Sequence, residues 1–111
     1  MSANTGRRTD IHQKQVLDQM VVKTAAATLE IYETQVRANT TAGAMTITLP
    51  AVAEAKGLFF SIIFETDGGD LTIADQDDSY DFTDEVFDNA LDRIMYYSDG
   101  FVWWVMSLDE V

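Results

Sequence analysis

Cysteine is absent from this sequence, and histidine and proline occur once each. Without cysteine, neither a disulfide framework nor a thiolate metal site can form. His12 stands in a polar stretch and no G-x-S-x-G segment is present, so the usual nucleophilic triads lack their parts. Acidic residues are abundant, so a paired-carboxylate mechanism stays open, but no two of them stand apart from the rest. The sequence predicts a protein that is not an enzyme and uses no cofactor.

Long hydrophobic runs are also missing. The longest, Leu58–Phe64 and Phe101–Met106, have the length of strands, whereas crossing a bilayer takes about 20 residues. The first 15 residues are polar and lack the apolar core of a secretory signal. We expect one soluble domain, made in a reducing compartment and without a membrane partner, because 111 residues suit a single domain.

Positive charge is scarce and unevenly placed. The net charge is −12, yet residues 1–23 hold four basic and two acidic residues, and residues 65–92 hold 11 acidic residues and no basic one. The pattern predicts a flexible basic arm over residues 1–21, with Arg7, Arg8 and Lys14 as partner-binding charges, and a β domain over residues 22–111. The acidic domain would repel nucleic acid. The alternative is that the charge serves solubility alone.

Strand signals dominate after the arm. Residues 45–49 alternate apolar and polar side chains, and Pro50 ends that run. Residues 67–70 read DGGD between two apolar runs, which predicts a hairpin that pairs Thr66 with Leu71 and Phe64 with Ile73. We read residues 75–81 as a loop, and residues 82–91 stay open between a helical turn and a strand with loops. The expected fold is all-β, a small antiparallel β-sandwich or barrel-like domain.

The last hairpin has large apolar groups on both faces. With Asp99 and Gly100 as a type I′ turn, Tyr96 pairs with Trp103, and neighbouring tryptophans point to opposite sides. One face, predicted to enter the core, holds Ile94, Tyr96, Phe101, Trp103 and Val105. The other is predicted to be a subunit interface, made by Met95, Tyr97, Val102, Trp104 and Met106. The alternative is that the N-terminal segment or residues 82–91 cover this second face within one chain.

Residues 75–81 offer oxygen ligands at alternate positions, but they do not make an EF-hand. The sixth position is Tyr80 rather than glycine, and the twelfth is Val86 rather than glutamate. An irregular calcium site stays open, and a solvated acidic loop is the simpler interpretation.

Four motifs follow one another between about residues 22 and 107: TITLPA at 46–51, GLFFSI at 57–62, GGDLTI at 68–73 and SDGFVW at 98–103. This order resembles the small β domains of tailed-phage virion proteins, found in head decoration (cement) proteins and in some fibre proteins. The segment 75–92 is more acidic than that pattern. The resemblance implies a homotrimer that binds the major capsid protein on the outer capsid surface, made in the host cytoplasm. The alternative is a tail-fibre or receptor-binding module.

Overall fold

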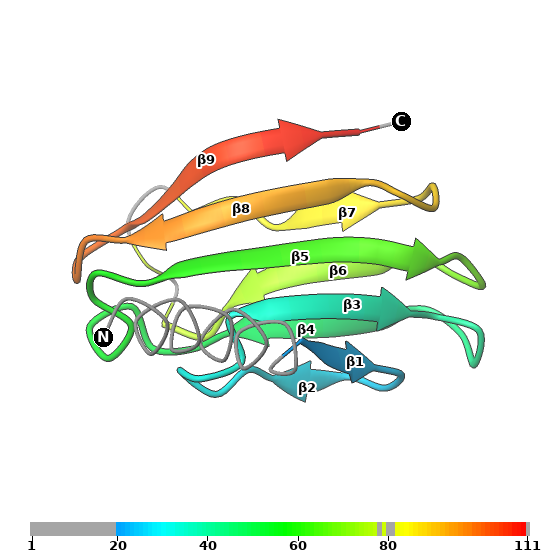
Figure 1. Ribbon diagram of the computed structural model, residues 1–111, viewed down its shortest axis with the longest axis horizontal. Coiled ribbons are helices and arrows are strands. Elements are labelled where there is room, and N and C mark those ends of the chain that lie inside the picture. The colour runs from blue at the N-terminus through cyan, green and yellow to red at the C-terminus, as the bar shows by residue number, and fades with distance from the viewer. Residues whose placement is uncertain (1–19, 78, 80–81, 111) are drawn as a thin grey trace, which may run out of the picture.

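The computed structural model describes residues 20–77, 79 and 82–110, and every regular element within that part of the chain is a strand. The strands lie in two layers (Figure 1). A five-stranded sheet, here sheet A, has the order β1-β3-β5-β8-β9, and a four-stranded sheet, sheet B, has the order β2-β4-β6-β7. Their bounds are β1 Val21–Lys23, β2 Ala27–Thr28, β3 Gln35–Asn39, β4 Met45–Leu49, β5 Phe59–Thr66, β6 Leu71–Asp75, β7 Glu85–Phe87, β8 Arg93–Ser98 and β9 Trp103–Asp109.

The chain changes sheet after each of its first five strands. As a result β1, β3 and β5 pair in parallel in sheet A, and β2, β4 and β6 pair in parallel in sheet B. Only β7, β8 and β9 add antiparallel pairs. The all-β prediction is confirmed, but the prediction of an antiparallel sandwich is wrong, since both sheets are mixed.

The predicted hairpin at residues 67–70 is a crossing between the sheets. Phe64 pairs with Ala38, and Ile73 pairs with Ile47, so β5 and β6 do not pair with each other. The buried Thr40, in the crossing between β3 and β4, holds this crossing against its own. Its Oγ1 donates to the carbonyl of Gly69 at 2.7 Å and accepts from the amides of Gly68 and Gly69 at 2.9 and 3.0 Å.

The close packing of the β3–β4 and β5–β6 crossings explains why glycine occupies both central positions, 68 and 69, of the β5–β6 crossing. A Cβ atom on Gly68 would lie 2.5 Å from the Thr40 carbonyl oxygen, and one on Gly69 would lie 2.5 Å from the Ala44 amide. Those contacts are backbone contacts, which a small side-chain shift cannot relieve. The Gly-Gly pair therefore serves the approach of one backbone to another rather than a hairpin turn.

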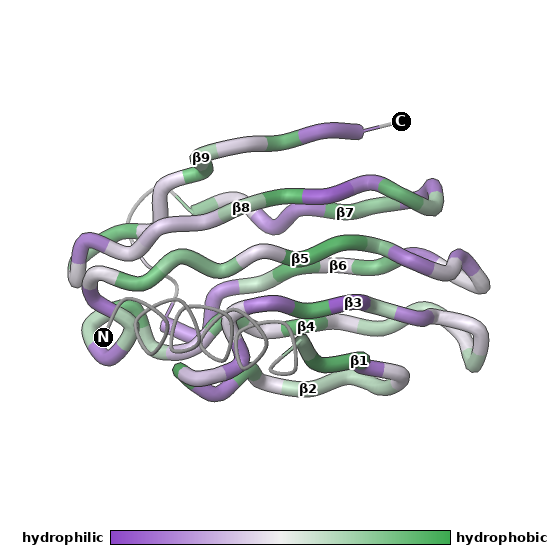
Figure 2. The backbone as a smooth tube through the Cα atoms, viewed as in Figure 1, coloured by the Kyte–Doolittle hydropathy of each residue, from purple (hydrophilic) through white to green (hydrophobic). Residues whose placement is uncertain are grey.

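The core lies between the two sheets and is built from alternate residues of the long strands. Figure 2 shows β5 as largely hydrophobic through its middle and polar towards its end. Because successive side chains point to opposite faces, the inward positions of β4, β5 and β6 are buried while their neighbours stay partly exposed. The most buried large side chains are Tyr96, Phe60, Phe64, Phe87, Ile47, Leu49, Ile62, Leu71, Ile73 and Val36.

The last hairpin keeps its predicted inward tryptophan but not its predicted register. Trp103 is 7% exposed and packs edge-on against Phe60, with ring centroids 5.6 Å apart. It pairs with Ser98 rather than Tyr96, so four residues rather than two connect the strands. A shift of two positions leaves the facing of each side chain unchanged, which is why Trp103 is still inward. Two predicted inward residues are exposed instead: Phe101 at the loop tip and Val105 on the last strand.

Residues 82–91 contain a short strand rather than a helical turn. The strand, β7, pairs antiparallel with β6 at the edge of sheet B. It therefore does not cover the outer face of the last hairpin, and that alternative for residues 82–91 is wrong. The basic arm residues Arg7, Arg8 and Lys14 lie outside the described residues.

Candidate functional site

The outer face of sheet A carries a row of aromatic side chains. Phe59 of β5 pairs with Tyr97 of β8, and Tyr97 pairs with Trp104 of β9. The Phe59 and Tyr97 rings lie 4.7 Å apart at 45°, and Phe59 and Trp104 are 50% and 54% exposed. These three residues, the aromatic row, form a continuous apolar ridge across three strands that sheet B cannot reach.

The connection before β9 fixes the position of Trp104. One carboxylate oxygen of Asp99 accepts from the indole Nε1 of Trp104 at 2.9 Å, and the other accepts from the amides of Phe101 and Val102. The Trp104 indole, followed by those backbone amides, holds the pKa of the Asp99 carboxyl below its usual value. The indole is thereby held in one orientation while its ring stays open to contact, as a preformed binding surface requires.

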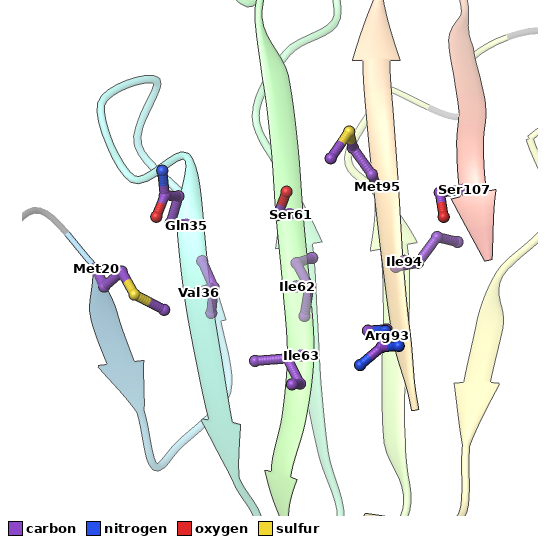
Figure 3. A pocket seen from close by; sticks show the side chains of 10 residues that line it. All are labelled: Met20, Gln35, Val36, Ser61, Ile62, Ile63, Arg93, Ile94, Met95 and Ser107. Atoms are coloured by element: carbon purple, nitrogen blue, oxygen red, sulfur yellow. The ribbon is translucent and has the colours of Figure 1, made fainter. Parts of the chain in front are cut away.

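A groove of about 450 Å³ lies beside the aromatic row (Figure 3). Its floor crosses the sheet from Gln35 through Ser61 and Met95 to Ser107, one residue from each of four neighbouring strands. Ser61 is small, whereas the next outward residues of β5 on either side, Phe59 and Ile63, are large. The depression is therefore a consequence of one small residue among large ones.

Two exposed ion pairs lie on the same face. Arg37 Nε contacts Glu65 Oε2 at 3.0 Å, and Arg93 Nη2 contacts Asp109 Oδ2 at 2.8 Å. Exposed pairs of this kind contribute little stability, typically about 0–1 kcal/mol. Their effect here is to neutralise charge beside the groove and leave Met20, Ile63 and Met95 as its dominant apolar lining.

The structure brings three of the five predicted interface residues together. Met95 and Trp104 are exposed on the outer face, with Tyr97 half-buried between Phe59 and Trp104. Met106 is exposed as well and is the extra residue of a bulge in β9, while Val102 is half-buried in the connection before that strand.

Sequence reasoning missed Phe59. The signal was present, because Phe59 and Phe60 are adjacent in a strand and must point to opposite faces, as Trp103 and Trp104 do. Phe60 is fully buried and Phe59 is half exposed. On β5, as on β9, one of two adjacent aromatic side chains is therefore buried and the other is exposed.

An acidic contact joins the ends of the two sheets. Glu85 of β7 shares a hydrogen bond with Glu110, and that bond, burial and the nearby charges of Glu110 and Asp92 raise the pKa of Glu85 to about 7. Burial, followed by the charges of Glu85 and Asp84, raises the pKa of the Tyr96 phenol well above its usual value. The Glu85–Glu110 contact is most stable when the two carboxyl groups share a proton, so its stability depends on pH.

The acidic loop after β6 uses its carboxylates internally. Asp75 accepts from the amides of Asp77 and Ser79, and Asp77 accepts from the amide of Val52. Within residues 20–77, 79 and 82–110, no group of three or more histidine or acidic side chains is placed to hold a metal ion. In the same residues no helix is long and apolar enough to cross a membrane.

Comparison with known proteins finds no match among family models, curated proteins or solved structures.

Proposed function

We propose that the protein is a structural component of a phage head, a decoration protein that binds the outer capsid surface and stabilises contacts between major capsid subunits. The observation that carries the proposal is the exposed aromatic row with its apolar neighbours. A fixed, open Trp104 beside Phe59 is a feature of binding surfaces, in which aromatic anchors supply much of the affinity.

The exposed area supports association with a protein. The side chains of Phe59, Met95, Tyr97, Trp104 and Met106 expose on the order of 400 Å². Apolar patches of this size are as large as the largest patch of a typical monomer and are often functional. One partner in a standard interface buries roughly 800 Å², so this patch could supply about half of such a contact.

Strand β9 extends that patch to the edge of sheet A. It has seven residues, pairs only with β8, and carries no charge before Asp109. Long edge strands in monomers are usually blunted by charge or proline, and β9 has only a bulge. Contact between copies along β9 and the hairpin face gives the homotrimer that we propose, and the trimer in turn presents several arms to the major capsid protein.

The test is particle binding by matched variants. Trp104→Ala is expected to lower self-association and to lower occupancy on capsids that lack this protein. Tyr32→Ala removes an aromatic side chain that is 69% exposed in the β2–β3 connection and should change neither. Light scattering and capsid co-sedimentation are the measurements.

The proposal fails if the unmodified chain does not bind such capsids. Binding to whole host cells but not to capsids would instead indicate the tail-fibre or receptor-binding alternative. Binding that Trp104→Ala leaves unchanged would place the contact elsewhere on the domain.

A further inference from the structure

The β8–β9 connection, residues 99–102, carries the most exposed large apolar side chain in the described part of the chain. Phe101 is 80% exposed and lies at one end of sheet A, at the tip of the last hairpin (Figure 1). Its amide and that of Val102 both donate to one oxygen of Asp99, at 2.8 and 2.9 Å. The backbone around Phe101 is therefore held in one conformation, which lowers the entropy lost when its ring is buried against a partner.

The groove on sheet A has the size and the lining to accept such a ring. Its volume is about 450 Å³, and a cavity of about 150 Å³ already accommodates benzene. Figure 3 shows the small Ser61 side chain on the floor, between those of Gln35 and Met95. Met20 and Ile63 complete the apolar lining. An aromatic ring placed over Ser61 contacts these larger side chains and is removed from water, which favours its insertion.

Phe101 cannot reach the groove of its own chain. Met95 lies three positions before Ser98, the last residue of β8, a distance of about 10 Å at roughly 3.3 Å per residue. The aromatic row stands between them, because Tyr97 and Trp104 lie nearer to the connection than Met95 does. Only another chain can therefore place this side chain in the groove.

We infer that Phe101 of one copy inserts into the sheet A groove of the next copy, and that three such contacts close the homotrimer. The inference rests on the homotrimer of the proposed function. In a threefold ring each contact joins two different surfaces of the chain, whereas a patch that meets its own copy gives a dimer. The aromatic row alone is one surface. The connection and the groove supply the unlike pair, and the same contact covers the row beside the groove.

Local charge does not oppose this contact. The chain has a net charge of −12, so copies repel one another at long range. Asp99 is the only charged residue of the connection, and Arg93, which pairs with Asp109, is the only charged residue among the described ones that line the groove. The contact thus joins an acid to a base rather than two acidic clusters. Charges elsewhere are screened beyond about 8–10 Å at physiological salt, so the trimer should weaken at low ionic strength.

Two substitutions remove the two sides of the contact separately. Phe101→Ala removes the inserted ring and should weaken self-association by roughly tenfold or more, as loss of a central aromatic anchor does. Ser61→Phe fills the groove from its own chain and should have the same effect. The matched controls are Tyr32→Ala, at an exposed aromatic residue of the β2–β3 connection, and Thr46→Phe, at an outward position of β4. Sedimentation velocity at micromolar concentration is the measurement.

Mixing the two variants gives a result that is specific to unlike surfaces. The Phe101→Ala chain keeps its groove and the Ser61→Phe chain keeps its Phe101, so one complete contact can form between them. We expect each variant alone to be monomeric and the mixture to form a one-to-one dimer that cannot close a ring. The recovered association also shows that both variants are folded. A contact made by one self-complementary patch predicts no recovery.

The inference is overturned if the unmodified chain sediments as a monomer, if either variant still forms the trimer, or if the mixture stays monomeric. A trimer that persists in Ser61→Phe while capsid occupancy falls would assign the groove to the major capsid protein. Capsid co-sedimentation is scored separately from self-association. If the mixing results are as expected and the unmodified chain does not bind capsids, the proposed function fails and the inferred contact stands.

Discussion

Two adjacent tryptophans have opposite environments and therefore opposite expected effects. Trp103 is buried against Phe60 and Tyr96, so Trp103→Ala leaves a cavity and should lower the free energy of unfolding by about 3–5 kcal/mol. Trp104 is 54% exposed, and Trp104→Ala should cost less than half as much. Chemical denaturation of both variants is the measurement. Equal losses would contradict the assignment of faces.

Thr40 joins two crossings between the sheets through one hydroxyl group. Thr40→Val keeps the shape but leaves the amides of Gly68 and Gly69 without their acceptor. Buried unsatisfied groups cost about 1–3 kcal/mol each, so for two amides we expect a loss of roughly 2–6 kcal/mol in the free energy of unfolding. Thr41→Val, at the exposed neighbouring residue, is the control, and denaturation curves should separate the two variants clearly.

At the scale of elements, the contact between β7 and the end of β9 should respond to pH. The pKa of Glu85 is about 7 in the folded chain against 4.5 for the ordinary group, so the folded state holds more protons between these values. Its contribution to stability is therefore fully present below about pH 4.5 and is lost as the pH rises through about 7.

Glu85→Gln keeps a hydrogen-bonding group there and removes the titration. We expect the melting temperature of this variant to exceed that of the unmodified chain at pH 8 and to vary less between pH 5 and pH 8. The carboxyl group of Glu33 affects the pH dependence of stability in the opposite sense, and at lower pH. Burial alone would raise its pKa, but hydrogen bonds from Lys23 and the Glu30 amide lower it, so its contribution is lost only on acidification below its ordinary value. If the melting temperature of Glu85→Gln depends on pH as that of the unmodified chain does, the Glu85–Glu110 contact has no role in stability.

At the scale of the whole molecule, the proposed function gives the basic arm a measurable role. Replacing Arg7, Arg8 and Lys14 by glutamine should weaken capsid binding and reduce its dependence on salt, because exposed charges are screened. Each contact is expected to contribute under about 1 kcal/mol, and several arms per trimer multiply the effect. Lys56→Gln, at an exposed cation of the β domain, is the control. The measurement is capsid occupancy as a function of salt concentration. If the glutamine variant shows the same salt dependence as the unmodified chain, these three charges have no role in attachment.

The sequence by itself determined most of the long strands and, along them, most of the side chains that face inward. Period-two alternation fixes the facing of a residue whatever strand lies beside it, which is why Trp103 was correctly predicted inward even though its register was not. The same alternation predicts that Phe59 faces outward when Phe60 faces inward, which identifies Phe59 as a member of the aromatic row.

Only the tertiary structure decided which strands are neighbours. A Gly-Gly turn between two apolar runs has the same local chemistry in a hairpin and in a crossing between sheets. In the folded chain the amides of Gly68 and Gly69 donate to the hydroxyl group of Thr40, 28 and 29 positions away, so the crossing is stabilised by a residue distant in sequence. The groove was likewise decided by partners distant in sequence, since Ser61 forms a depression only beside Gln35, Met95 and Ser107. Contacts between residues so far apart leave no local pattern in the sequence from which pairing could be inferred.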